Sequence, residues 1–226
     1  MVKFVASTGL SVNTRLLKGL NFIIPYLVAL LLLSTVMPCI AAATEGTELK
    51  NVGVKFEEKT QVGKTDLLLN GMGLRTVFLF KVYAVGLYLT EKKATAETVL
   101  SAGGAKRLHF VMLREITAEQ LAEGLLNAMD KNDTEAERAL LKPHIDEFRA
   151  LILSLQVIPK GTIINLDYLP ETGARFSLNG QTKGADIAGE SFYRALLKIW
   201  LGPRPAQENL KNALLGIPQY KSKGGE

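Results

Sequence analysis

The stretch NGMGLRTVFLFKVYAVGLYL, from Asn70 to Leu89, combines two glycines, one arginine and a long run of apolar, β-forming residues. Arg75 is its only cation before Lys81. A guanidinium stays protonated at any ordinary pH, so an apolar setting is costly for it unless an anion lies close by. The stretch therefore predicts a buried part of a sheet with one fixed positive charge at its margin.

Further strands are predicted on both sides of this stretch. Residues 51–70 alternate apolar and polar side chains up to a break at Asn70–Gly71, and residues 76–89 read as a long apolar strand or hairpin arm. Residues 106–116 are apolar on both faces, which indicates a central strand covered on each side. Two later strands are expected to form a hairpin around residues 170–173.

Helices are predicted between and after these strands. Thr117 followed three residues later by Gln120 is the pattern of a capping box at the start of a helix. A second helix is expected over 133–155, and two more over 188–202 and 205–217. This order of elements predicts an α+β fold with one large antiparallel sheet backed by helices.

The first 43 residues have the pattern of an export signal. Residues 19–44 contain no charged side chain, basic residues precede them, and Ala41 and Ala43 form an A-x-A cleavage site. The uncharged run is also long enough to span about 30 Å of hydrocarbon, so the alternative is an uncleaved membrane anchor. We expect residues 1–43 to be a signal peptide, residues 44–226 to be the domain, and the protein to be exported to the periplasm or secreted.

Removing that segment changes the bulk properties of the chain. The full sequence carries a formal net charge of +5, but residues 1–43 hold three basic and no acidic residues, which leaves +2. That charge gives no reason to expect nucleic-acid binding. Cys39 is the only cysteine, and His109 and His144 lie far apart, so we expect no metal and no cofactor. Membrane contact is expected only through the N-terminal signal.

Four blocks carry a family resemblance: GMGLR, FKVYAVGLYL, LREITAEQLAEGL and RALLKIWLGPRP. Together and in this order they resemble the chalcone isomerase family, in particular its bacterial, exported, chalcone isomerase-like branch. The resemblance runs from about Val52 to Ile217. It implies an open-faced β-sandwich, in which a large antiparallel sheet is layered against helices with a ligand cleft between them.

The resemblance also implies roles for two residues. In the plant isomerases, the arginine of the glycine-arginine motif stabilises the enolate that forms during ring closure, and Arg75 matches it in place. In the fatty-acid-binding branch, the matching arginine and a tyrosine on the next strand are expected to hold a carboxylate. Tyr83 falls where the plant isomerases carry a catalytic threonine. The resemblance thus makes Arg75 and Tyr83 the candidate ligand-binding residues.

Other positions depart from the plant enzymes. Leu121 and Ala128 stand where those enzymes have a tyrosine and an asparagine, and Arg194 stands where they have a hydroxyl. Asn127 is one residue out of phase, which on a helix turns a side chain by about 100°. These replacements favour binding over isomerase activity.

Three functions follow for residues 44–226. The first is a non-catalytic binder of a small amphipathic carboxylate such as a fatty acid, because a planar guanidinium suits a carboxylate and an apolar sheet suits a tail. The second is an intramolecular lyase that closes a chalcone to a flavanone, with Arg75 as its catalytic residue. The third is an envelope interaction module with a vestigial cleft, which would be filled by Phe78, Phe80 and Leu121.

Two structural questions decide between these functions. Arg75 could instead form a structural ion pair, for which the candidates are Asp66, Glu115 and Glu119. In addition, eight residues of straight strand would separate Arg75 from Tyr83 by roughly 26 Å. The two side chains converge only if the chain reverses near residues 76–78, where the sequence has no strong two-residue turn signal.

Overall fold

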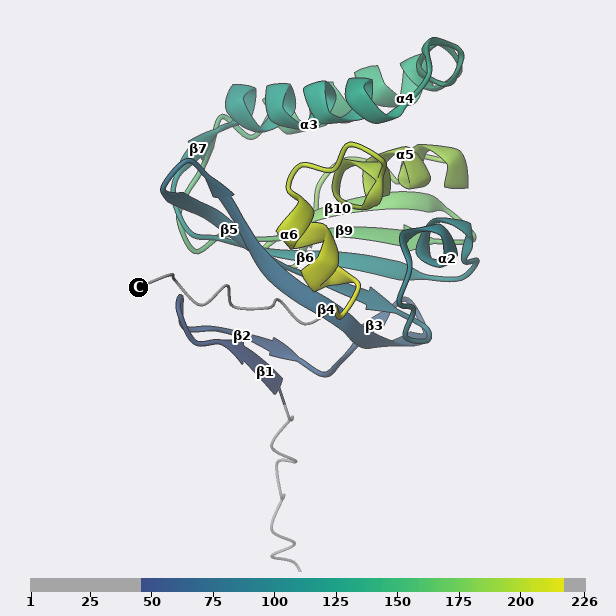
Figure 1. Ribbon diagram of the computed structural model, residues 1–226. Helices are drawn as coiled ribbons and strands as arrows, with labels where there is room; N and C mark the ends of the chain where they lie inside the picture. Colours follow the sequence, from purple (N-terminus) through teal and green to yellow (C-terminus); the bar gives the residue numbers. More distant parts are fainter. Residues whose placement is uncertain (1–45, 218–226) are drawn as a thin grey trace, which may run out of the picture. The chain divides into compact units, whose positions relative to one another are not determined.

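The structure is a computed structural model, and it describes residues 46–217 (Figure 1). The predicted signal segment lies outside these residues. The described residues lie within one compact unit, residues 44–226. This unit contains the whole described sheet, its helices and its apolar cores, so it has what a domain needs to fold on its own.

One seven-stranded antiparallel sheet organises the fold. Its strands lie in the order β11-β10-β9-β6-β5-β4-β3, so β6 is central, as its two apolar faces predict. The predicted α+β class with a large antiparallel sheet is confirmed. The strands are β3 Lys59–Val62, β4 Thr65–Val77, β5 Phe80–Leu89, β6 Lys106–Met112, β9 Ile163–Leu169, β10 Gly173–Leu178 and β11 Gln181–Thr182.

Helices cover one face of this sheet (Figure 1). Helix α5 contacts the sheet and is itself contacted by α2, α3 and α4. Eight of its twelve residues are buried, which explains its apolar sequence. Thr117 and Gln120 form the predicted capping box at the start of α3. The helices are α2 Ala96–Ser101, α3 Ala118–Asn132, α4 Glu135–Leu153, α5 Glu190–Leu201 and α6 Glu208–Leu214.

The other face of the sheet carries a smaller apolar cluster. Phe56 contributes to it from the hairpin formed by β1 Gly46–Leu49 and β2 Val54–Glu57. A Cβ on Gly86 would lie 2.7 Å from the Phe56 ring, so the glycine makes room for this aromatic side chain. A second small pair joins β7 Ile116–Thr117, directly before α3, to β8 Val157–Ile158, which follows α4. The arrangement is the predicted open-faced β-sandwich.

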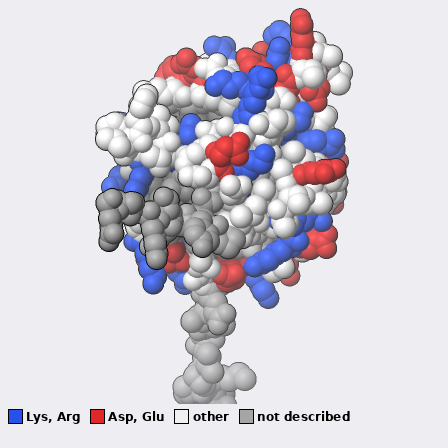
Figure 2. Space-filling model, viewed as in Figure 1, with Lys and Arg blue, Asp and Glu red and all other residues white. Residues whose placement is uncertain are grey.

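The opening stretch of the sequence forms the β4–β5 hairpin. The chain reverses at Phe78–Leu79, so residues 76–77 end β4 and do not begin the next strand as expected. Phe78 has φ 53°, a conformation that glycine normally supplies, so this turn lacks the residues that usually indicate one. The tip is the uncharged projection at the left of Figure 2.

The predicted break at Asn70–Gly71 is a register shift inside β4, and the strand continues through it. Helix α6 packs closely against this part of β4. A Cβ on Gly71 would lie 2.2 Å from the Ala213 carbonyl oxygen, and one on Gly73 would lie 2.8 Å from the Leu210 side chain. The two glycines of the motif therefore let a helix approach the strand that carries Arg75.

Candidate functional site

A cleft of about 550 Å³ lies beside the β4–β5 hairpin. Its other walls are α3 and the connection between α5 and α6. Most of the lining is apolar, and the apolar lining residues are Val77, Val82, Ile116, Leu121, Leu125, Ala128, Ile199, Pro205 and Ala206. Such a volume falls within the usual range of roughly 300–1,000 Å³ for small-molecule sites.

Arg75 and Tyr83 both line this cleft. They are directly opposed across β4 and β5, because the hairpin reverses the chain between them. Opposed residues in an antiparallel pair point to the same face of the sheet, with Cβ atoms about 4.5–5.5 Å apart. The distance expected for a straight strand therefore does not apply, and the two candidate residues can reach one small group.

The guanidinium of Arg75 is held by neutral groups. Its Nη1 donates to the Thr76 carbonyl oxygen at 3.2 Å and to Gln207 Oε1 at 3.4 Å. Among residues 46–217 it forms no ion pair, so none of the three carboxylates considered above neutralises it. Within the same residues, its Nε and Nη2 donate no hydrogen bond. The half-buried charge thus keeps one edge of its fork available for a ligand.

Gln207 fixes the position of this guanidinium. Its Oε1 also accepts a hydrogen bond from the Thr76 backbone N–H at 2.9 Å, so the side chain bridges the end of β4 to the start of α6. The sequence pattern did not point to Gln207, because its contact spans more than 130 residues. A glutamine before a helix carries no signal that could have revealed it.

The Tyr83 hydroxyl oxygen accepts a hydrogen bond from Trp200 Nε1 at 2.9 Å. Indole N–H can only donate, so the Tyr83 hydroxyl proton remains free to be donated elsewhere. Burial raises the pKa of Tyr83, while the Trp200 hydrogen bond and the Arg75 charge act in the opposite direction. The hydroxyl therefore remains protonated at neutral pH and is a neutral donor beside the guanidinium.

The charge of the cleft is of one sign. Arg75 is the half-buried cation, and exposed Arg114, Lys131 and Arg204 also line the cleft. Among the lining residues of the described chain there is no aspartate or glutamate. A cleft with four cations, no carboxylate and an apolar interior has the features expected for an amphipathic anion.

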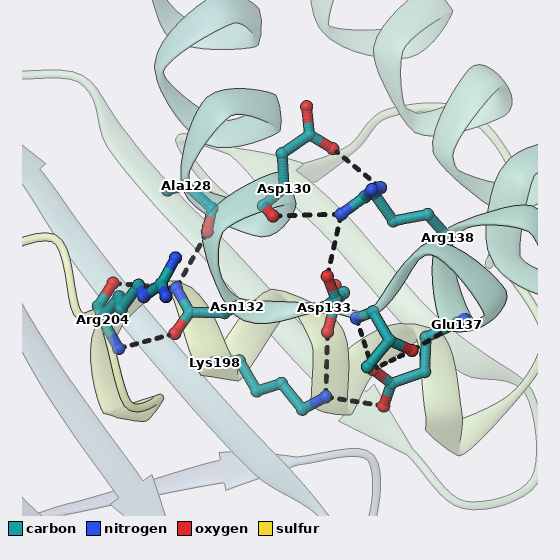
Figure 3. A network of polar contacts seen from close by, with 9 residues as sticks. Ala128, Asp130, Asn132, Asp133, Glu137, Arg138, Lys198 and Arg204 are labelled. Carbon is teal, nitrogen blue, oxygen red and sulfur yellow. Dashed lines mark hydrogen bonds and ion pairs between the residues drawn. The ribbon is translucent and has the colours of Figure 1, made fainter.

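A polar network fixes α3 as a wall of this cleft (Figure 3). Asn132 donates from Nδ2 to the Arg204 carbonyl oxygen at 2.8 Å and accepts from the Arg204 backbone N–H at 2.9 Å. Lys198 on α5 donates to Asp133 at 2.9 Å and to Glu137 at 2.8 Å. The end of α3 is thereby tied to α5 and to the loop that lines the opposite side of the cleft.

The remaining family positions divide between the cleft and the surface. Leu121 and Ala128 line the cleft, where they supply apolar area in place of polar groups. Asn127 also lines it, although the helical phase argued against this residue. Arg194 is exposed outside this cleft and lies 3.7 Å from Glu190. Gln207 and Trp200 are two polar residues at the site that no local sequence pattern indicated.

The tip of the hairpin does not fill the cleft. The Phe78 side chain is 93% exposed and Phe80 is 61% exposed, and neither lines the cleft. The cleft volume is therefore open to a ligand, contrary to what a vestigial cleft requires. Over residues 46–217, no group of three or more potential metal-ligating side chains is found, and no helix is long and apolar enough to cross a membrane.

A large antiparallel sheet with a helical layer on one face and a cleft at its edge defines the open-faced β-sandwich class of folds. The chain belongs to the chalcone isomerase-like family, whose sequence profile matches residues 48–216. No curated protein sequence matches the chain.

Solved structures support the same fold. The crystal structure of a fatty-acid binding protein from Arabidopsis thaliana aligns with a TM-score of 0.59 at 17% sequence identity. The alignment covers 76% of this chain and 96% of that protein. At this identity, the similarity establishes a shared fold.

Proposed function

We propose that this chain is an exported, non-catalytic binder of a small amphipathic carboxylate, with a fatty acid as the ligand class. Arg75 and Tyr83 hold the carboxylate, and the apolar lining of the cleft holds the tail. One observation carries the proposal: a half-buried guanidinium without an acidic partner among the described residues lies opposite a hydroxyl whose proton is free.

The chemistry of these two side chains suits a carboxylate. The free edge of the Arg75 fork can donate two parallel hydrogen bonds, the geometry that carboxylates accept best. The Tyr83 hydroxyl adds an uncharged donor from the neighbouring strand. The fatty-acid binding protein with the same fold supports this ligand class.

The tail would contribute most of the affinity. Each buried methylene contributes about 0.8 kcal/mol, which corresponds to roughly a fourfold change in affinity. Affinity should therefore rise with chain length until the cleft is full, and then stop rising. An enzyme selective for an aromatic enone would not show this dependence.

Isomerase activity is the alternative function. An oxyanion donor such as Arg75 could stabilise an enolate, but the same site must also orient a phenolate. The positions that carry a tyrosine and an asparagine in the plant enzymes are Leu121 and Ala128 here, and both are apolar. Turnover of a chalcone above its spontaneous rate, lost in Arg75→Lys, would replace binding by catalysis as the function.

Lipid extraction of the purified protein followed by mass spectrometry tests the binding function directly. Trp200 is the only tryptophan of the chain and contacts Tyr83, so its fluorescence should also change as fatty acids are titrated in. We expect a bound fatty acid and the chain-length series described above. Absence of both extracted and added ligand would exclude the proposed function.

Arg75→Ala tests the role of the guanidinium. Loss of a charged hydrogen-bonding partner costs about 1.5–3 kcal/mol, so affinity should fall roughly tenfold or more. Arg149→Ala is the matched control, because Arg149 is an exposed arginine on α4 that does not line the cleft. Equal lipid loading of wild type and Arg75→Ala would count against Arg75 as the headgroup contact.

A further inference from the structure

The tip of the β4–β5 hairpin exposes four consecutive apolar side chains. Val77 is 39% exposed, Phe78 93%, Leu79 93% and Phe80 61%. Eight large apolar residues are exposed in the part of the chain that the structure describes, and half of them are these four. Single exposed apolar residues are ordinary, whereas a contiguous run at a protruding tip indicates a contact surface.

The local conformation gives no structural reason for this composition. Turns favour glycine, asparagine and aspartate, and Phe78 adopts φ 53°, where a bulky side chain is unfavourable. Neither Phe78 nor Leu79 contributes to either apolar core. The tip therefore carries exposed apolar area that does not stabilise the folded chain.

Basic side chains surround the base of the tip. Lys81 follows it directly, and the Arg114 guanidinium lies 5.0 Å from the centre of the Phe80 ring. Glu115 is the acidic residue next to Arg114 in the sequence. Figure 2 shows the uncharged projection in white with basic groups in blue at its base. We call Lys81 and Arg114 the basic collar. An apolar tip with such a collar is complementary to a surface that is apolar inside and anionic outside.

The tip also lies at the edge of the ligand cleft. Val77 in the tip and Val82 just after it both line the cleft. The cations Arg75, Arg114 and Arg204 line the same cleft. A surface bound by the tip would thus lie next to the cleft.

We infer that the 77–80 tip inserts into the interfacial layer of an anionic lipid bilayer, so that the cleft lies beside the membrane and exchanges an amphipathic ligand with it. Apolar side chains buried at the boundary of headgroups and acyl chains, together with nearby cations, are the two contributions that hold proteins at such surfaces. This contact is separate from the membrane contact predicted for the N-terminal segment. Docking by the tip does not depend on the ligand, whereas exchange rests on the proposed function.

Vesicle flotation tests the docking. The form that begins at Thr44 is used, because residues 1–43 could bind lipid by themselves, and the full chain is run in parallel. We expect this form to float with vesicles of phosphatidylcholine and phosphatidylglycerol, more weakly with phosphatidylcholine alone, and less at high salt. Failure to float with either composition at low salt would overturn the inference.

Phe78→Ser/Leu79→Ser is the decisive variant. Both side chains are exposed and outside the cleft, so folding and the affinity for soluble fatty acid should be unchanged, while vesicle binding should weaken roughly tenfold or more. Leu140→Ser is the matched control, because Leu140 is 76% exposed on α4. Vesicle binding equal to wild type in the double variant would refute insertion of the tip.

The charge contribution and the alternative partner are tested separately. Lys81→Glu should weaken binding to anionic vesicles, whereas Lys92→Glu, exposed beyond the other end of β5, should not. Equal loss of vesicle binding in Lys81→Glu and Lys92→Glu would contradict a role for the basic side chains at the base of the tip.

Self-association that depends on Phe78 and Leu79, without vesicle binding, would show instead that the tip contacts a second copy of the chain. The two proposals, ligand binding at Arg75 and membrane docking by the tip, can fail separately. They are distinguished if Arg75→Ala loses only fatty-acid binding and the tip variant loses only vesicle binding.

Discussion

Trp200 donates its indole N–H to the Tyr83 hydroxyl oxygen at 2.9 Å, which joins helix α5 to strand β5 next to the cleft that Tyr83 lines. The Phe110 ring contacts both residues, with ring centres 5.3 Å from Tyr83 and 5.2 Å from Trp200. Because the indole cannot accept a hydrogen bond, the tyrosine proton is not used in this contact. The helix layer thus leaves the Tyr83 hydroxyl proton available to a ligand.

Tyr83→Phe should therefore have two separable effects. Loss of the hydroxyl removes one ligand donor, so fatty-acid affinity should fall by roughly a factor of ten in a calorimetric titration. The variant also leaves the Trp200 N–H without its acceptor, which should lower the free energy of unfolding by about 1–3 kcal/mol.

Tyr88→Phe is the matched control for this variant. The Tyr88 hydroxyl donates to the Glu57 carbonyl oxygen at 3.0 Å, and its ring lies in the apolar cluster on the other face of the sheet. Its loss should reduce stability without reducing affinity. A similar loss of affinity in both variants would mean that Tyr83 acts on the ligand only through the stability of the fold.

Much of the fold follows from local patterns in the sequence. The two apolar faces of residues 106–112 placed β6 at the centre of the sheet, and Thr117 with Gln120 marked the start of α3. Each of these signals depends on neighbouring residues, which is why a single sequence contains it. The family resemblance added the open-faced sandwich, which periodicity alone does not specify.

The site was less accessible to such reasoning. Arg75 and Tyr83 were identified by resemblance, but their convergence depends on a turn at Phe78 that has no turn-forming sequence. Gln207 and Trp200 act through contacts with residues more than 100 positions away. Local patterns cannot reveal contacts that exist only after α5 and α6 have packed on the sheet.

Gly71→Ala should displace helix α6 from the sheet. The added Cβ would lie 2.2 Å from the Ala213 carbonyl oxygen, a backbone atom that cannot move without moving the helix. Since Gln207 at the start of α6 holds the Arg75 guanidinium, the variant should lower both the melting temperature and the fatty-acid affinity. Thermal unfolding and Trp200 fluorescence titration measure the two effects.

Alanine substitutions at two other glycines serve as comparisons for Gly71→Ala. A Cβ on Gly103 would meet no atom within 4 Å, so Gly103→Ala should leave stability and affinity nearly unchanged. Gly73→Ala should be intermediate, because its contacts are with the Leu210 and Ala213 side chains, and Leu210 can shift. If Gly71→Ala were as stable as Gly103→Ala, close packing of α6 would not be the reason for this glycine.

The ion pairs at the end of α3 should make stability depend on acid pH. The Lys198 hydrogen bond, followed by the Thr134 backbone N–H, lowers the pKa of Glu137 from 4.5 to about 2. A carboxyl whose pKa is lower in the folded state stabilises the fold above its unfolded pKa, and this contribution is lost as the pH falls toward the folded value. Glu137→Gln should therefore lower the melting temperature at pH 7, and the difference from wild type should shrink between about pH 4.5 and pH 2.

Comparison with a second carboxyl isolates this effect from general acid unfolding. Glu123 is exposed on α3, so the difference in melting temperature between wild type and Glu123→Gln should stay small and constant over the same range. Glutamine at 137 can still accept the Thr134 N–H, so the pH-dependent part reports the charge opposite Lys198. A difference for Glu137→Gln that does not change between pH 7 and pH 2 would show that this ion pair does not anchor the α3 wall of the cleft.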